Sequence, residues 1–238
     1  MPSPAVLISG LLDFVVPEVC PVCMQDMPSV PAEVCDSCSG ALSEMNAPRC
    51  GACGGPIDGV LDLCTECLRR EERAWHHAVS VFPFRHQARE MVHRFKYNGQ
   101  PWLAAFLGRR MARSWLQYGD GWPSALIPIP LHPWKQWRRG YNQAYLLAEQ
   151  VGRILDVPVL QKLRRRRWSA PQAELGDEQR RRNMHGVFAY KADAEMVQKH
   201  IVVVDDVLTT GSTLQAAVET LKQWNPNARI GVLTVARG

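Results

Sequence analysis

The sequence predicts an α/β fold, with a mainly parallel sheet flanked by helices and a small cysteine-rich domain before it. Two observations support this prediction. Short runs of aliphatic and β-branched residues alternate with helical patterns from residue 79 onward, which is typical of strand–helix–strand units. All eight cysteines lie before residue 70, so the two parts of the chain differ in composition. We therefore expect one domain over residues 1–72 and an α/β domain over residues 73–238.

The cysteines form four Cys-x-x-Cys pairs, which are Cys20/Cys23, Cys35/Cys38, Cys50/Cys53 and Cys64/Cys67. Two pairs separated by about a dozen residues provide four thiolates, and tetrahedral Zn²⁺ accepts four thiolates in a closed structural site. The chain carries this arrangement twice, so it predicts two zinc ions. Short intervening segments favour local closure, which joins the first pair with the second and the third with the fourth rather than interleaving them.

Disulfides and an iron–sulfur cluster are the alternatives for the same thiols. The sequence shows no secretory signal, which disfavours disulfides, and the cysteine spacing matches none of the usual ferredoxin runs. The apolar segment over residues 4–16 carries Asp13, and we expect it to be a docking helix or strand. No stretch approaches the ~18 apolar residues that a membrane span needs. We therefore expect a cytoplasmic protein without membrane insertion.

Each element of the α/β domain follows from the local pattern. Short apolar runs bounded by turn residues predict strands over residues 79–84, 125–129, 157–160, 187–190, 201–204 and 230–235. Apolar residues that recur with helical spacing predict helices over residues 88–95, 102–117, 142–155 and 214–224. The last helix should end at Asn225, because Pro226 follows it. The alternation predicts a mainly parallel sheet with helices on both faces.

The strand over residues 201–204 leads directly into Asp205 and Asp206. Its four consecutive apolar residues indicate a strand that is buried on both faces. Because uncompensated burial of two acids costs several kcal/mol, we expect both just beyond the carboxyl end of the strand, where open parallel sheets bind ligands. Adjacent carboxylates suit the neighbouring hydroxyls of a ribose, and their charge favours a nearby Mg²⁺.

The turn after the two acids predicts a phosphate site, and its residues are Thr209, Thr210, Gly211, Ser212 and Thr213. Glycine allows close approach of the backbone, the hydroxyls can donate, and the following helix presents unpaired N–H groups. A core strand that ends at an ordinary capped helix is the alternative. The run of apolar residues, two acids and Thr-Thr-Gly-Ser-Thr resembles the phosphoribosyl-pyrophosphate (PRPP) motif of type I phosphoribosyltransferases. It is neither a Walker loop nor a dinucleotide fingerprint.

A second anion loop is predicted after the strand over residues 125–129. The segment Pro130, Leu131 and His132 leads into several cations and Gly140 just before a helix, and the cations are Lys135, Arg138 and Arg139. Backbone donors and cations together suit pyrophosphate. The alternative is a proline-rich turn with a solvated basic face. His132 is a candidate base, although a lone histidine beside prolines is more often a hydrogen-bonded loop residue.

Basic residues are clustered although the net charge is only +5. The largest clusters are Lys162 with residues 164–167, and residues 180–182. Such clusters indicate a polyanionic ligand, either pyrophosphate or nucleic acid. Arg165 and Arg167 are candidates to reach a leaving pyrophosphate, while tryptophans beside arginines could stack single-stranded bases; the latter are Trp134, Trp137 and Trp168.

Several blocks together resemble the ComF and GntX family of competence and DNA-utilisation proteins. They are the two cysteine ribbons, the Phe-Lys-Tyr-x-Gly segment around Lys96, the Arg-Arg-Gly-Tyr-Asn-Gln block at 138–143, the Ser-Ala-Pro-Gln segment at 169–172, and the motif at 205–213. The resemblance implies a type I phosphoribosyltransferase fold behind a zinc-binding head, and an arginine-rich loop that closes over pyrophosphate. Ser169 stands where the family usually has threonine, so the hydroxyl is kept.

From these features we expect a ComF-like phosphoribosyltransferase that binds PRPP with Mg²⁺ and displaces pyrophosphate at ribose C1. Asp205 and Asp206 would hold the ribose, and Arg138 and Arg139 the pyrophosphate. The expected context is DNA uptake and natural transformation or nucleotide salvage, with competence or DNA-processing proteins as partners. The alternatives are a non-catalytic single-stranded DNA-binding competence protein that retains the PRPP-binding fold, and a ribbon head that binds a partner protein.

Overall fold

The computed structural model describes residues 19–27, 33–45, 48–57, 60–69, 73–166, 186–191 and 199–238. The chain forms two compact units, Met1–Ser43 and Glu44–Gly238. The expected docking segment at 4–16 lies outside the described residues, as do Arg167, Trp168, Ser169 and residues 180–182. No helix within the described ranges is long and apolar enough to cross a membrane.

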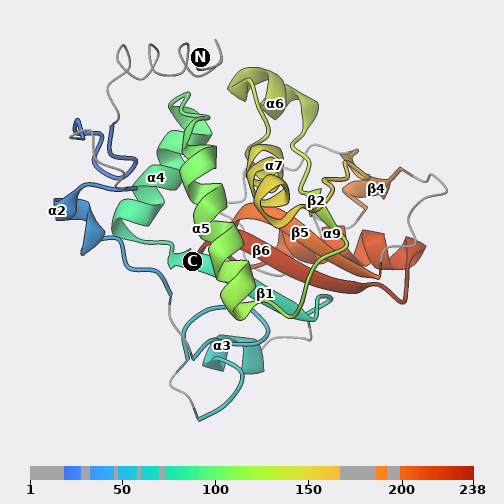
Figure 1. The fold of residues 1–238 in the computed structure, drawn as a ribbon. Helices are drawn as coiled ribbons and strands as arrows, with labels where there is room; N and C mark the ends of the chain where they lie inside the picture. Colours follow the sequence, from blue (N-terminus) through green and yellow to red (C-terminus); the bar gives the residue numbers. More distant parts are fainter. Residues whose placement is uncertain are drawn as a thin grey trace, which may run out of the picture. The chain divides into compact units, whose positions relative to one another are not determined.

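The second unit is built on a four-stranded parallel sheet with the order β1-β6-β5-β2 (Figure 1). Its strands are β1 (His77–Pro83), β2 (Ala125–Pro128), β5 (His200–Leu208) and β6 (Arg229–Arg237). The run Ile201 to Val204 is fully buried at the centre of this sheet, as a strand covered on both faces should be. The α/β fold predicted from the sequence is therefore confirmed.

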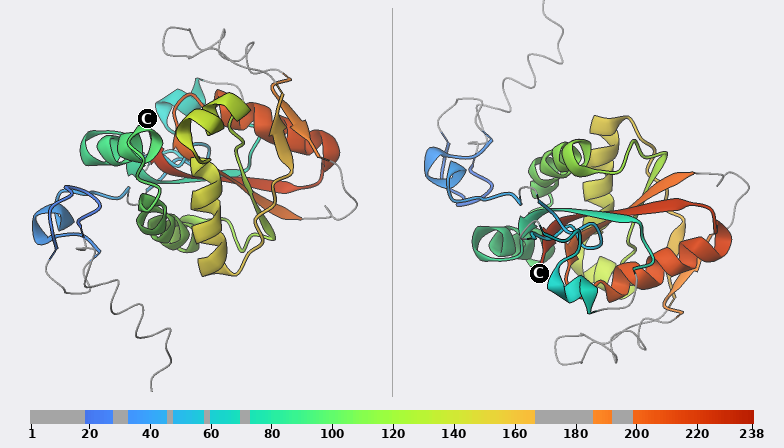
Figure 2. Two further views of the ribbon diagram at one scale, coloured as in Figure 1. Left: turned by 90° about the horizontal axis from the view of Figure 1, so that it is seen from above. Right: turned by 90° about the horizontal axis from the view of Figure 1, so that it is seen from below.

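Helices cover both faces of the sheet. Figure 2 shows α5 (Leu103–Tyr118) and α7 (Gln143–Leu155) on one face and α9 (Ser212–Trp224) on the other. The helix α4 (His86–Tyr97) packs beside α5. Leu103, Leu107 and Met111 recur with helical spacing in α5 and are fully buried, so this apolar stripe lies in the core, where α5 packs on α7 and β1. Each of these four helices begins and ends within two residues of the predicted bounds.

Two predicted strands do not join the main sheet as full strands. The segment 157–160 forms only a bridge between Leu126 and Val159, since Pro158 offers its carbonyl to Leu126 but has no N–H to donate. The strand β4 (Phe188–Tyr190) pairs instead with β3 (Leu163–Arg165) in a separate antiparallel sheet. It also packs on α9, where the rings of Tyr190 and Trp224 lie 5.3 Å apart. The prediction that residues 187–190 extend the parallel sheet was therefore wrong, whereas residues 157–160 extend it only by this one parallel bridge.

Three segments near the predicted site are more regular than expected. The strand β5 continues to Leu208 because β6 pairs with it to the end, whereas β2 stops at Pro128 opposite Val204. The two acids therefore lie inside the last part of β5, beyond the end of β2 but not beyond β5 itself. The predicted loop of residues 133–139 is a short helix, α6 (Pro133–Arg139), with proline in its first turn. Part of the arginine-rich loop forms β3.

The cysteine ribbons close locally. One cluster joins Cys20, Cys23, Cys35 and Cys38, and the other joins Cys50, Cys53, Cys64 and Cys67. The short helices α2 (Asp36–Ser39) and α3 (Thr65–Leu68) carry the last cysteine of each cluster. The second cluster belongs to the second compact unit, where its cysteines share a hydrophobic core with Trp75 and Leu214. The sequential pairing is confirmed, and the domain boundary after residue 72 stays a prediction.

Candidate functional site

Asp205 and Asp206 lie near the carboxyl end of β5. The Lys96 ammonium at the end of α4 lies 2.7 Å from a carboxylate oxygen of Asp206. The backbone N–H of Asp206 donates to the carboxylate of Asp205 over 2.8 Å. Burial and the adjacent Asp206 raise the pKa of Asp205 to about 7. Burial alone would lower the pKa of Lys96, but the two carboxylates outweigh it and raise that pKa.

Thr209, Thr210 and Gly211 link β5 to α9, and Ser212 and Thr213 begin that helix; we call residues 209–213 the phosphate loop. Gly211 adopts φ +82°, in the left-handed region that favours glycine. The hydroxyls of Thr210 and Ser212 lie 2.9 Å apart and hydrogen-bond one another. Thr210 precedes α9 and Ser212 is its first residue. The first N–H groups of this helix of 13 residues have no intrahelical acceptor. The loop therefore combines hydroxyl and backbone donors in the way the sequence predicts for an anion site.

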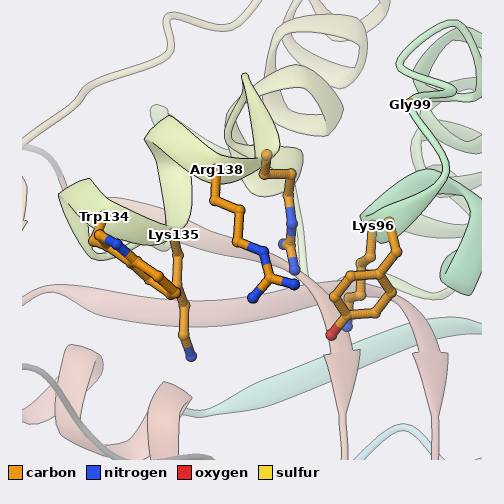
Figure 3. Close-up of a pocket in the computed structure, with 7 residues that line it drawn as sticks. Lys96, Gly99, Trp134, Lys135 and Arg138 are labelled. Atoms are coloured by element: carbon orange, nitrogen blue, oxygen red, sulfur yellow. The ribbon is translucent and has the colours of Figure 1, made fainter.

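A pocket of about 610 Å³ lies between the end of α4 and α6, and we call it the basic pocket (Figure 3). Figure 3 shows Lys135 and Arg138 extending into it from α6, with Lys96 on the other side. Its lining residues are Lys96, Tyr97, Gly99, Trp134, Lys135, Arg138 and Arg139. Burial and three neighbouring cations lower the pKa of Lys135, as expected where positive charges gather. The pocket is thus arranged for an anion.

Arg165 on β3 belongs to the same electrostatic cluster. Burial lowers the pKa of Arg165, and the negative charge of Asp205 offsets only part of this effect. The positive charge of Arg165 in turn lowers the pKa of Lys135. Its guanidinium also lies over the Phe188 ring at 5.6 Å, which fixes β3 against β4. Arg165 therefore lies within electrostatic range of Asp205 and of Lys135 in the basic pocket. Its predicted companion Arg167 lies outside the described residues.

Aromatic rings orient the arginines of the basic pocket. The Arg138 guanidinium lies 5.7 Å from the centre of the Trp134 ring, and that of Arg139 lies 4.9 Å from the Tyr97 ring. Such contacts favour one orientation of a long side chain and leave its N–H groups available. The pocket cations are therefore partly preorganised.

The segment between β2 and α6 has a structural role that the sequence predicted in part. Pro130 and Leu131 are half-buried residues that lead from β2 to α6, and Gly140 ends α6 in a left-handed conformation. The His132 ring accepts a hydrogen bond from the Trp134 N–H over 3.3 Å and so caps α6. This favours the interpretation of His132 as a hydrogen-bonded residue over that of a base.

Sequence reasoning did not identify the partner of Asp206. Lys96 stood out only as part of a family-like segment, and the aromatic lining of the pocket by Tyr97 was not predicted. The signal that could have pointed to Lys96 is energetic: a buried carboxylate needs a cation, and Lys96 is the last cation of the helix α4. Choosing it among all cations of the chain requires the fold.

Both cysteine clusters have the geometry of a tetrahedral metal site. Within each cluster the sulfur atoms lie within 4.8 Å of one another. Sulfur separations of 3.6 Å (Cys23 to Cys35) and 3.7 Å (Cys53 to Cys64) approach the edge of about 3.8 Å expected for Zn–S bonds of about 2.3 Å. All eight cysteines lie within the described ranges and form no disulfide there, so the geometry favours metal binding over the disulfide alternative. The clusters fit two structural zinc ions, which would cross-link each ribbon.

Comparison with known proteins places the chain in a family. Residues 138–238 match the model of the phosphoribosyl transferase domain, and residues 11–68 match that of the double zinc ribbon domain. Competence protein F of Haemophilus influenzae is 34% identical over 169 residues, which cover 67% of this chain and 72% of that protein. The chain belongs to the ComF family.

Two further relatives align with a similar share of this chain. The DNA utilization protein YhgH of Escherichia coli is 30% identical over 163 residues, covering 66% of this chain and 70% of that protein. Competence protein ComFC of Bacillus subtilis is 25% identical over 158 residues, covering 66% of this chain and 63% of that protein. The resemblance noted in the sequence is thereby confirmed, together with the phosphoribosyltransferase domain and the double zinc ribbon.

Proposed function

We propose that this ComF-family protein binds PRPP with Mg²⁺ and transfers the phosphoribosyl group to an acceptor, releasing pyrophosphate. One observation carries the proposal. Asp205 and Asp206 lie between two segments that suit anions, since the phosphate loop begins directly after Leu208 at the end of the same strand and Lys96 joins Asp206 to the basic pocket. PRPP has the matching order of groups, with a ribose between a 5′-phosphate and a pyrophosphate.

Each part of the site suits one part of this substrate. The phosphate loop would take the 5′-phosphate on its hydroxyls and on the first N–H groups of α9. Asp205 and Asp206 would accept hydrogen bonds from the ribose hydroxyls. Lys135, Arg138 and Arg139 would bind the pyrophosphate, and Arg165 on β3, which lies within electrostatic range of Lys135, would assist them.

The ion pair of Lys96 and Asp206 suggests how the site rearranges on binding. The Lys96 ammonium contacts an Asp206 carboxylate oxygen that would otherwise be available to accept a hydrogen bond from the ribose. When a ribose hydroxyl takes this oxygen, Lys96 can turn toward the pyrophosphate, because it also lines the basic pocket. Binding of the sugar would thus release a cation where the leaving group sits.

The two carboxylates are hard oxygen ligands, the kind that Mg²⁺ prefers, so they fit this ion. Bound there with PRPP, Mg²⁺ would neutralise part of the pyrophosphate charge. In the transfer step the bond between ribose C1 and the pyrophosphate oxygen breaks, and its electron pair leaves with pyrophosphate. An acceptor nitrogen or water forms the new bond to C1 and gives up a proton. Asp205 and Asp206 would favour the cationic sugar, and the basic pocket the leaving oxygens.

Thermal unfolding with PRPP and Mg²⁺ tests the binding step. At a ligand concentration of about 100 times Kd, binding adds about 2.7 kcal/mol, which corresponds to a rise in Tm of roughly 5–10 °C. Asp205→Asn and Asp206→Asn should abolish the rise. Asp156→Asn is a matched control, because Asp156 is exposed at the end of α7 in a left-handed conformation that asparagine tolerates. A parent protein whose Tm does not respond to PRPP would contradict the proposal.

A screen of acceptors for pyrophosphate release from PRPP tests the transfer step. We expect release that depends on one acceptor and that disappears in Asp205→Asn. The Lys135→Met variant should slow release, because it removes a cation from the basic pocket. Binding of PRPP without release for any nitrogen acceptor or water would support the non-catalytic alternative.

Single-stranded DNA binding is a second candidate function, and exposed tryptophans on α6 favour it. Trp137 is 83% exposed and Trp134 is 47% exposed, with Arg138 lying over the Trp134 ring. An aromatic surface beside cations can stack bases and neutralise phosphates. The printed names of the relatives, competence and DNA utilization proteins, support a role in the uptake or use of DNA.

Fluorescence anisotropy with a labelled single strand tests this second candidate. Affinity should fall steeply with salt, because each phosphate contact releases a counterion. Trp137→Ala should weaken binding by roughly tenfold, since base stacking contributes ~1–3 kcal/mol. Trp122→Ala is the control, because Trp122 is also exposed, at 62%, but lies before β2 at the opposite end of the sheet. Equal affinities of the two variants would exclude α6 as the DNA surface.

A further inference from the structure

The segment from Arg73 to Trp75 joins the second cysteine cluster to β1, and it also contacts the phosphate loop. Arg73 donates a hydrogen bond from its guanidinium to the Thr210 carbonyl over 2.9 Å. The backbone N–H of Ala74 donates to the Gln215 side chain, in the first turns of α9, over 3.1 Å. The segment therefore holds both the loop and the start of the helix that follows it.

The other side of the same segment contacts the second cysteine cluster. Trp75 is only 4% exposed, and its indole N–H donates to the Ala52 carbonyl over 2.6 Å. Ala52 lies between Cys50 and Cys53, in the turn that carries two of the four thiols. The position of the Trp75 ring is thus tied to the geometry of that turn.

The contact between the Trp75 ring and the loop is close. A Cβ atom added to Gly211 would lie 3.0 Å from the edge of this ring and 2.7 Å from the Arg73 guanidinium. The same guanidinium lies 5.1 Å from the centre of the Trp75 ring. Trp75 therefore lies between the cysteine turn and the phosphate loop, and Arg73 contacts both the Trp75 ring and the loop.

Arg237 makes a second link between the cluster and the site. Its guanidinium lies 3.8 Å from the Glu66 carboxylate, on the short helix that carries Cys67. It also donates to the Leu208 carbonyl over 3.4 Å, at the residue just before the phosphate loop. Two separate side-chain paths therefore connect the second cluster with the two ends of the loop.

We propose that the second cysteine cluster, with its metal bound, positions the phosphate loop, and that Arg73 and Trp75 are the positioning residues. The inference deepens the proposed function and rests on it. A loop that binds a phosphate must hold its donors in one arrangement, and metal binding fixes the cysteine turn against which Trp75 packs. Because coupling between two sites is reciprocal, a bound phosphate ligand must also raise the affinity of this cluster for its metal.

Calorimetry with ribose 5-phosphate and with PRPP plus Mg²⁺ tests the positioning role. We expect Arg73→Gln to weaken both ligands by about tenfold, because it removes a hydrogen bond from a charged group, and Trp75→Phe by about fivefold, because the hydrogen bond that it removes joins two neutral groups. Trp115→Phe is the control for Trp75→Phe, because Trp115 is 2% exposed and its indole N–H also donates to a carbonyl, that of Gly121. Arg69→Gln is the control for Arg73→Gln, since Arg69 is an exposed arginine at the end of α3. Both controls should bind within about twofold of the parent.

Zinc release provides a readout that a merely structural role would not change. A chromogenic chelator should remove two zinc ions from the parent protein, and saturating PRPP with Mg²⁺ should slow the release of only one of them. Trp75→Phe should lose this protection, whereas Trp115→Phe should keep it. If the Trp75 variant does not fold, Arg73→Gln carries the same test.

The outcomes separate the two proposals. A parent protein that binds neither ligand overturns the proposed function and the positioning role together. A parent that binds, with variants and controls of equal affinity and no ligand-dependent zinc retention, overturns the positioning role alone. Weaker ligand binding together with lost zinc retention in the Trp75 or Arg73 variant supports it.

Discussion

The ion pair between Lys96 and Asp206 allows a quantitative prediction about the ligand-free protein. Their charged atoms lie 2.7 Å apart, and the two side chains are 20% and 12% exposed. For an effective dielectric constant of about 20, the attraction at this distance is about 6 kcal/mol. Desolvation of the two ions offsets most of it. We therefore expect a net coupling of about 2 kcal/mol between the two residues.

A double-mutant cycle measures this coupling. Lys96→Met keeps the length of the side chain but leaves Asp206 buried next to Asp205, so it should lower stability by about 3 kcal/mol. Asp206→Asn should cost less, because Lys96 stays within electrostatic range of Asp205, whose negative charge raises the pKa of Lys96. The double variant should lose about 2 kcal/mol less than the two single losses combined.

Urea unfolding of the four proteins, at one fixed zinc concentration, provides the free energies. Thermal unfolding gives a second measure, in which a loss of about 3 kcal/mol corresponds to a fall in Tm of roughly 6–12 °C. If the two single losses add to within about 0.5 kcal/mol, the ion pair does not stabilise the free protein, and the rearrangement proposed for Lys96 loses its basis.

Three further predictions concern pH, the phosphate loop and the cysteine clusters. Because the pKa of Asp205 is raised from 3.8 to about 7, its contribution to stability is full below the unfolded value and is lost as pH rises through 7. Asp205→Asn should thus gain Tm relative to the parent between pH 6 and 8, and parallel profiles would contradict this. Gly211→Ala should lower Tm and abolish ribose 5-phosphate binding, since its Cβ would collide with Arg73 and Trp75 at a left-handed φ; calorimetry checks this, with Gly186→Ala as control, because Gly186 has a similar φ but open space around it. Cys53→Ser should destabilise the second unit by several kcal/mol more than Cys23→Ser in urea unfolding, because Cys53 is buried in its core and Cys23 is exposed in the first unit; equal unfolding midpoints would count against this.

The features that the sequence predicts well are those encoded within a short stretch of chain. The central strand is visible because four apolar residues in a row match a strand buried on both faces. The phosphate loop is visible because its glycine, hydroxyls and following helix are contiguous. The pairing of the cysteine ribbons is also local, and the clusters confirm it.

The features that the sequence does not predict depend on contacts between distant segments. The pairing of β4 with β3 rather than with the main sheet depends on the residues that β4 contacts in the fold. A short apolar run predicts a strand but does not indicate its partner. The extension of β5 through the acids follows from the length of β6. Likewise, Lys96 is one cation among many until the end of α4 is placed beside Asp206.

The charges of the site also explain why two acids can be tolerated inside a strand. Asp205 and Asp206 follow each other in β5, so their side chains point to opposite faces of the sheet. Lys96 compensates one of them directly, and Arg165 lies within electrostatic range of the other. The surrounding cations of the basic pocket still outnumber the acids, so the free site carries a surplus of positive charge. Both the burial of the acids and the surplus of cations would become favourable with the proposed sugar phosphate in the site, because it would accept hydrogen bonds from the cations while its hydroxyls would donate to the carboxylates.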